Sequence, residues 1–229
     1  MLPNLEETEE THVRPLSEYV ATAPLTTDRL LALTKAITEA LAQNHALGTW
    51  RGDLAPARIL WDGADSITLL DAPMPAEPPL NFERSTGREA LDAVGYLAPE
   101  QCDDTLGEPG PRSDVFALGV IVFELASGEH PFAGRRGDEI VSNILSFDPP
   151  TPGQIHPALP LEWDAICACC MHKPIEQRFA SALDVLPFLA KLASSGGTRR
   201  RQQRLAWDRI VLAMVVLISL MALAVWLLG

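Results

Sequence analysis

Two acidic residues in an apolar stretch are the first candidates for chemistry in this chain. Residues 115–126 are apolar except for one glycine and Glu124, and Asp114 immediately precedes them. A carboxylate is costly to bury unless it is hydrogen-bonded or paired with a cation. We therefore expect Asp114 and Glu124 to have defined polar partners inside a core.

The stretch that carries these acids must be a central buried helix. Ser113 suits the N-cap, Asp114 places a negative charge in the first turn, and Gly128 is a natural stop. A helix that is apolar on every face must be buried on every face. At about a dozen residues it is too short to span a bilayer, which needs roughly 20. The pattern predicts a mainly helical domain packed around this helix.

Weaker signals place the other elements in chain order. Thr27 is expected to cap a helix that ends near Gly48, and the next apolar runs predict a hairpin of residues 59–61 and 67–70 with a turn at Asp62-Gly63. The sequence further predicts a proline-rich loop without periodicity at 71–94 and an irregular stretch with five prolines at 148–160. Helices are predicted at 138–145, 161–171 and 179–192.

The C-terminal end has the pattern of a membrane anchor. Ile210–Leu228 carries no charge, and 19 residues at about 1.5 Å each span roughly 28 Å, the thickness of a bilayer core. Five arginines between residues 199 and 209 precede this stretch. By the positive-inside rule they place the preceding domain in the cytoplasm. We expect a single-pass transmembrane helix at 210–228 behind a basic linker at 193–209.

The charge and composition of the chain limit the kinds of molecule it can bind and suggest its source. The net charge is −12, but residues 1–198 hold 13 basic and 29 acidic residues, a net of −16. Such a body repels phosphate backbones, so a nucleic-acid partner is excluded. Residues 1–15 read as an acidic flexible tail without a signal peptide. The alanine- and arginine-rich, lysine-poor composition suggests a bacterial source, so the predicted anchor would lie in the inner cell membrane.

Several short motifs together resemble the large lobe of the protein kinase family. The stretches are GYLAPEQ (95–101), SDVFALGVIVFELASG (113–128), HPF (130–132) and KPIEQRF (173–179). The order of elements over about residues 16–192 is similar to that lobe. The resemblance implies a mainly helical, α+β fold with one small β-hairpin.

The resemblance also implies structural roles for three residues. Ala98-Pro99-Glu100 is similar to the family's A-P-E motif, and Arg178 occupies the place of the arginine that pairs with its glutamate. Glu100 and Arg178 would then form a buried ion pair, in which each charge offsets the cost of burying the other. Asp114 matches the central-helix aspartate that holds the backbone of the catalytic loop.

The catalytic motifs depart from the family pattern. RGDLAPAR (51–58) stands where the family has H-R-D-L-x-x-x-N, and Asp71-Ala72-Pro73 stands where it has D-F-G. The resemblance makes Asp53 the catalytic-base position and Asp71 a metal ligand, and it puts Arg58 in place of the metal-binding asparagine. We expect the Arg58 guanidinium within about 6 Å of Asp71, where it would stand in for the missing cation.

The family's nucleotide-binding small lobe has no counterpart in the sequence. There is no glycine-rich loop, and the only lysine before Asp53 is Lys35, which lies in a predicted helix. ATP and Mg²⁺ are expected only if the site is functional. The first hypothesis is therefore a membrane-anchored pseudokinase that docks or regulates cytoplasmic or membrane signalling proteins, such as an active kinase.

Two alternatives stay open at this point. One is a divergent serine/threonine kinase that binds ATP through Asp53 and Asp71, with a small lobe supplied by another chain or missing from the start of the sequence. The other is a non-functional fragment, in which case the isolated domain should fail to fold because the face that would meet a small lobe is apolar.

Overall fold

A computed structural model describes residues 13–20, 25–63, 66–70 and 86–194. The chain divides into two compact units, Met1–Phe188 and Leu189–Gly229. The first unit contains the candidate site and is described below. The predicted anchor at residues 210–228 and the predicted metal ligand Asp71 lie outside the described residues.

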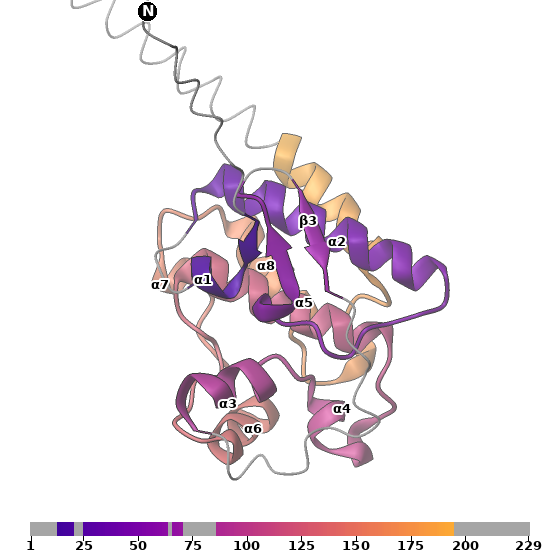
Figure 1. Ribbon diagram of the computed structural model, residues 1–229, viewed down its shortest axis with the longest axis vertical. Coiled ribbons are helices and arrows are strands. Elements are labelled where there is room, and N and C mark those ends of the chain that lie inside the picture. Colours follow the sequence, from indigo (N-terminus) through magenta and orange to yellow (C-terminus); the bar gives the residue numbers. More distant parts are fainter. Residues whose placement is uncertain (1–12, 21–24, 64–65, 71–85, 195–229) are drawn as a thin grey trace, which may run out of the picture. The chain divides into compact units, whose positions relative to one another are not determined.

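The central helix is α5, Pro111–Ser127 (Figure 1). Every one of its residues from Ser113 onward is buried. It begins earlier than predicted, with Gly110 as the N-cap and Pro111 at the first helical position, because a proline there lacks only an N–H that would be unsatisfied anyway. The predicted stop is confirmed, since Gly128 ends the helix in the left-handed conformation, with φ of 79°.

Two further helices pack against α5. Helix α2, Thr27–Ala46, turns a stripe of buried residues toward the core at the spacing of one helix face: Leu30, Leu33, Thr34, Ile37, Thr38, Leu41 and Ala42. Its N-cap is Thr26, one residue before the predicted cap. Helix α8, Leu161–Cys170, also contacts α5, and its buried residues are Trp163, Ile166, Cys167 and Cys170. The three helices make the core of the unit.

A small antiparallel sheet lies beside α2 in the order β1, β2, β3 (Figure 1). Strands β2, Ile59–Trp61, and β3, Ile67–Leu69, form the predicted hairpin. The predicted single hairpin is extended by a third strand, β1, Arg14–Pro15, in the N-terminal segment for which no strand was expected. Two residues carry too little periodicity to be seen in a sequence. Helix α1, Ser17–Val20, follows directly.

Two predictions of irregular structure are wrong. Residues 87–94, placed in a long loop, form helix α3, Gly87–Val94, and residues 152–155 form helix α7, Pro152–Ile155. Both helices are shorter than the window of roughly 11–18 residues in which hydrophobic periodicity identifies a helix. Helix α7 depends instead on the Thr151 cap, whose side chain accepts a hydrogen bond from the Gln154 N–H.

The remaining elements complete the unit. They are α4 (Pro99–Cys102), α6 (Gly137–Ser146), the helical residues 182–188, and three short 3₁₀ helices, η1 (Pro56–Arg58), η3 (Asp104–Leu106) and η4 (Ile175–Gln177). Across the described ranges, none of the helices is long and apolar enough to cross a membrane.

The contact between α5 and α8 leads to a first prediction. A Cβ atom on Gly119 would lie 2.5 Å from the Cβ atom of Cys170 and 2.8 Å from Cγ of Met171. Gly119→Ala should therefore push the helices apart and lower the free energy of unfolding by about 1–3 kcal/mol in urea denaturation. Gly110→Ala is the control: nothing lies within 4 Å of its Cβ position, so it should lose only the small N-cap preference of glycine over alanine, less than about 1 kcal/mol. Equal stability of the two variants would contradict the close packing.

Candidate functional site

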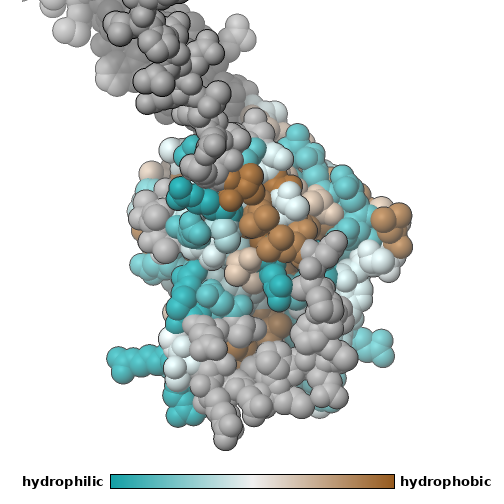
Figure 2. Space-filling model, in the orientation of Figure 1, coloured by the Kyte–Doolittle hydropathy of each residue, from teal (hydrophilic) through white to brown (hydrophobic). Residues whose placement is uncertain are grey.

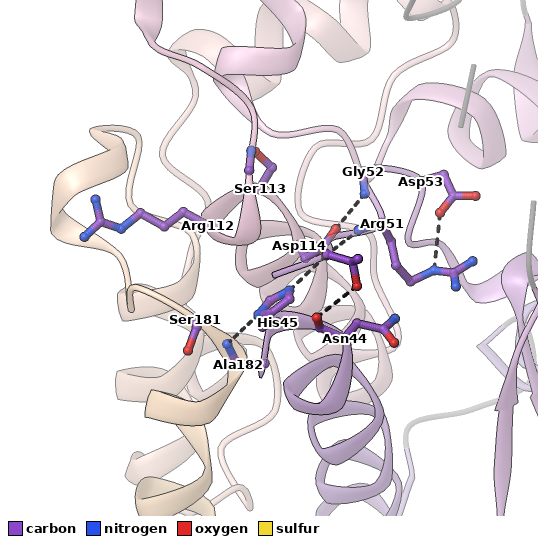
Figure 3. A network of polar contacts seen from close by, with 12 residues as sticks. Asn44, His45, Arg51, Gly52, Asp53, Arg112, Ser113, Asp114, Ser181 and Ala182 are labelled. Atoms are coloured by element: carbon purple, nitrogen blue, oxygen red, sulfur yellow. Dashed lines mark hydrogen bonds and ion pairs between the residues drawn. The ribbon is translucent and has the colours of Figure 1, made fainter. Parts of the chain in front are cut away.

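A buried carboxylate in the first turn of α5 fixes the loop that precedes β2. Asp114 is fully buried, and its Oδ1 accepts a hydrogen bond from the Gly52 N–H at 2.7 Å. Its Oδ2 accepts from the Arg51 N–H at 2.8 Å and contacts Nε2 of His45 at 3.0 Å (Figure 3). The two amide bonds attach the loop backbone to the central helix.

His45 is a functional residue that sequence reasoning missed. Its Nδ1 accepts a hydrogen bond from the Ala182 N–H at 3.1 Å, so the ring hydrogen is on Nε2, which donates to Asp114 (Figure 3). The side chain is only 1% exposed. A signal was available, because His45 follows Leu41 at the i+4 position of the buried stripe of α2.

The conformation of Gly52 explains the residue type at that position. Its φ is 71°, in the left-handed region, and a Cβ atom there would lie 2.5 Å from the indole of Trp50. The Gly52 carbonyl accepts a hydrogen bond from Nε2 of Gln101 at 2.8 Å, and Oε1 of Gln101 accepts from the Ala98 N–H at 3.0 Å. Helix α4 and α5 therefore hold the loop from two sides.

Asp53 lies between two guanidinium groups. Its Oδ1 is 3.3 Å from Nε of Arg51, and its Oδ2 is 4.0 Å from Nε of Arg58. Burial raises the pKa of Asp53, while the two arginines act to lower it. Arg51 also donates a hydrogen bond to the carbonyl of Leu70, so it connects the loop to the end of β3. The carboxylate is mostly buried and ion-paired on both oxygens.

The expected contact between Arg58 and Asp71 falls outside the described residues and stays a prediction. Within the described part of the chain, Arg58 pairs with Asp53 and its side chain is 46% exposed. No group of three or more His, Cys, Asp or Glu residues in the described ranges could hold a metal ion.

The expected ion pair between α4 and the C-terminal segment is present. Arg178 donates from Nη1 and Nη2 to the two oxygens of Glu100, both at 2.8 Å, and neither side chain is more than 1% exposed. Burial alone would raise the pKa of Glu100, but hydrogen bonds from Arg178 and Ser113 hold it below its usual value. The remaining Arg178 bonds go to the carbonyls of His172, Arg112 and Lys173.

The second acid of the central helix also has a partner. The Tyr96 hydroxyl donates a hydrogen bond of 2.6 Å to Oε2 of Glu124, and both residues are buried. Burial raises the pKa of Glu124, which the tyrosine bond partly offsets. The ring of Tyr96 contacts His130 edge to face, with ring centroids 5.2 Å apart. This contact attaches the segment before α4 to the end of α5.

The buried ion pair gives a second prediction. Arg178→Ala should leave Glu100 buried without a cation and lower the free energy of unfolding by about 3–5 kcal/mol. Adding Glu100→Gln should recover part of the loss, because the unpaired charge is then removed. The control is Arg88→Ala, which breaks an exposed pair with Asp92 and should change stability by less than about 1 kcal/mol. Failure of the double variant to recover stability would contradict this account.

Comparisons with known proteins agree with this geometry. The family model described as "Protein kinase domain" matches residues 5–186. The serine/threonine-protein kinase PknL of Mycobacterium tuberculosis is 30% identical over 160 residues, which cover 70% of this chain and 39% of that protein. PknH of Mycobacterium bovis is 31% identical over 169 residues, covering 71% of this chain and 27% of that protein.

A third relative extends the comparison beyond mycobacteria. The probable serine/threonine-protein kinase PknB of Bifidobacterium longum is 28% identical over 160 residues, covering 67% of this chain and 23% of that protein. The chain therefore spans less than two fifths of the length of these relatives. The matched domain, the loop held by Asp114 and the Glu100–Arg178 pair lead to one conclusion: this chain belongs to the protein kinase family.

Proposed function

We propose that this chain is a pseudokinase, a kinase-family domain that serves as a docking or regulatory module at the cytoplasmic face of a membrane. One observation carries the proposal. The carboxylate at the catalytic-base position, Asp53, is ion-paired with both Arg51 and Arg58. A base must be free to accept the proton of the attacking hydroxyl, and here a guanidinium group faces each of the two carboxylate oxygens of Asp53.

The charge of the loop supports the same proposal. Enzymatic phosphoryl transfer depends on metal ions and cations placed around the transferred group. In the kinase motif an asparagine that binds the metal follows the aspartate by five residues, and here that residue is Arg58. A guanidinium repels a divalent cation, so this residue type opposes the usual metal arrangement.

The backbone of the loop, in contrast, is held by hydrogen bonds from α5 and α4. Asp114 accepts from two loop amides, and Gln101 donates to the Gly52 carbonyl. Glu100 and Arg178 form a two-bonded buried pair. The chain thus keeps the contacts that hold the loop in place but changes the residues that would catalyse phosphoryl transfer. Such a loop is suited to binding another protein.

The proposed location rests on the sequence. Ile210–Leu228 has no charge, and the arginines at residues 199–209 precede it. We propose that these segments anchor the domain in a bacterial inner membrane through a single span. Its partners would be signalling proteins at the same membrane, such as an active kinase.

A divergent serine/threonine kinase is the second candidate. It is favoured by Asp53, whose backbone position is fixed by the neighbouring Asp114 contacts and whose pKa burial raises toward the range of a useful base. The relatives named above are serine/threonine kinases by name. This candidate requires Asp53 to lose its arginine partners when substrate binds.

Phosphate transfer separates the two candidates. The full-length chain, in a mild non-ionic detergent, is incubated with radiolabelled ATP, Mg²⁺ or Mn²⁺, and general protein substrates. We expect no more transfer than by the Asp53→Asn variant, because the carboxylate is held by Arg51 and Arg58. Transfer that exceeds the background and disappears in Asp53→Asn would establish the kinase and overturn the pseudokinase proposal.

A further inference from the structure

The side chain of Lys173 is held against two stacked aromatic rings. Its Nζ atom lies over the face of the Phe132 ring, 4.1 Å from the centroid, and is 6.0 Å from the centroid of Phe116. The two rings stack with their centroids 5.8 Å apart and their planes at 11°. Both rings are fully buried, unlike the hydrophobic area that is open to solvent in the upper half of Figure 2. The ring faces attract the ammonium group and draw it away from water.

The same nitrogen closes the end of a helix. Nζ of Lys173 donates a hydrogen bond to the carbonyl of Ile144, in the last turn of α6. The final carbonyls of a helix have no partner within the helix, and a cation near them is favourable. Lys173 lies between α8 and η4 in the chain, so this bond joins that segment to α6.

A second cation lies at the same aromatic pair. The guanidinium carbon of Arg178 is 4.9 Å from the centroid of Phe116. Arg178 engages both oxygens of Glu100, and within the described residues Lys173 makes no ion pair of its own. A lysine that is partly removed from water and lies near another cation loses its proton more readily, and its neutral amine is a nucleophile.

The charges around Lys173 agree with this geometry. Burial is the main cause that lowers the pKa of Lys173 to about 8. Asp148 opposes this shift, Arg178 adds to it, and Cys102 opposes it least. At pH 7.5 roughly a quarter of such amines are neutral, against roughly 0.1% of lysine amines with the ordinary pKa of about 10.4. The reactive form of this side chain is therefore well populated near neutral pH.

We propose that Lys173 is a modification site, at which a small acyl phosphate acylates the amine. The neutral Nζ attacks the acyl carbon, and a C–N bond forms as the C–O bond to the phosphate breaks. The leaving phosphate takes up the proton that Nζ releases, so atoms and charge balance without another co-reactant. A half-buried amine favours a small donor over a modifying enzyme, which must enclose an exposed lysine. This reaction is independent of phosphate transfer at Asp53 and of membrane attachment.

Acylation would remove a charge from the end of α6. The acylated Nζ keeps one N–H that can donate to Ile144, but it no longer carries the cation that Phe132 and the last-turn carbonyls favour. The amide of Phe147 reports on this turn, because it donates to the Asn143 carbonyl at 2.9 Å. We expect it to exchange at least about threefold faster after acylation, with no change in the amides of α2.

The test treats the full-length chain, in a mild non-ionic detergent, with acetyl phosphate at pH 7.5. Peptide mass spectrometry follows the three lysines of the chain, of which Lys35 and Lys191 are exposed and serve as internal references. We expect Lys173 to be acetylated at least about threefold faster than either reference. The preference should disappear in guanidinium chloride, where the chain is unfolded and the three amines have similar surroundings.

Two aspartate variants test the local charge. Asp148 is exposed and favours the ammonium form, so Asp148→Asn should speed the acetylation of Lys173 about twofold at pH 7.5. Asp184→Asn, the same change at an exposed aspartate in the helical residues 182–188, should leave the rate unaltered. A rate for Lys173 no higher than that of the two reference lysines, a preference that persists in guanidinium chloride, or no increase in Asp148→Asn would overturn the proposal.

Lys173→Arg tests the effect on α6, because arginine keeps the cation and is not acetylated under these conditions. Acetyl phosphate should no longer speed exchange at the Phe147 amide in this variant. Unchanged exchange at Phe147 in the acetylated chain, or the same increase in Lys173→Arg, would overturn the role of Lys173 at the end of α6.

Discussion

The site of this protein depends on one buried carboxylate. Asp114 accepts hydrogen bonds from the amides of Arg51 and Gly52 and from His45, so it joins α2, α5 and the loop before β2. A fully buried carboxylate is tolerated only when donors replace its water, and here three donors do so. The apolar surface of α5 buries the carboxylate, and the carboxylate in turn places Asp53.

The residues that depart from the kinase motif fit this support without disturbing it. Gly52 adopts a positive φ under the Trp50 indole, which leaves no room for a side chain. Arg51 donates its amide to Asp114 and its guanidinium to Leu70, and it also pairs with Asp53. The main-chain amides of Arg51 and Gly52 therefore fix the shape of the loop, whereas the Arg51 side chain sets the charge next to Asp53. This separation allows a kinase-family loop to keep its shape while its charge pattern changes.

Elements with a strong sequence pattern could be predicted from the sequence. Contacts that depend on local backbone turns or on tertiary packing could not. The run of apolar residues in α5 correctly predicted the helix at the centre of the core. The ion pair between Glu100 and Arg178 was also predicted, because each charge needs a partner if it is buried. Helix α3 was missed because it directly follows a proline-rich stretch and its eight residues are fewer than the window of roughly 11–18 in which helical periodicity is judged. The pairing of Arg51 with Asp53 depends on how the loop turns around Gly52, and no spacing rule reports a turn of that kind.

The most direct test of the account is amide hydrogen exchange in Asp114→Asn. The asparagine keeps the shape of the side chain, but its NH₂ group must face at least one of the three N–H donors, which then has no acceptor. We predict that the amides of Arg51 and Gly52 exchange at least about tenfold faster, beyond any change in the amides of α2 that follows from lower global stability. A uniform change in both regions would contradict the claim that this carboxylate holds the loop.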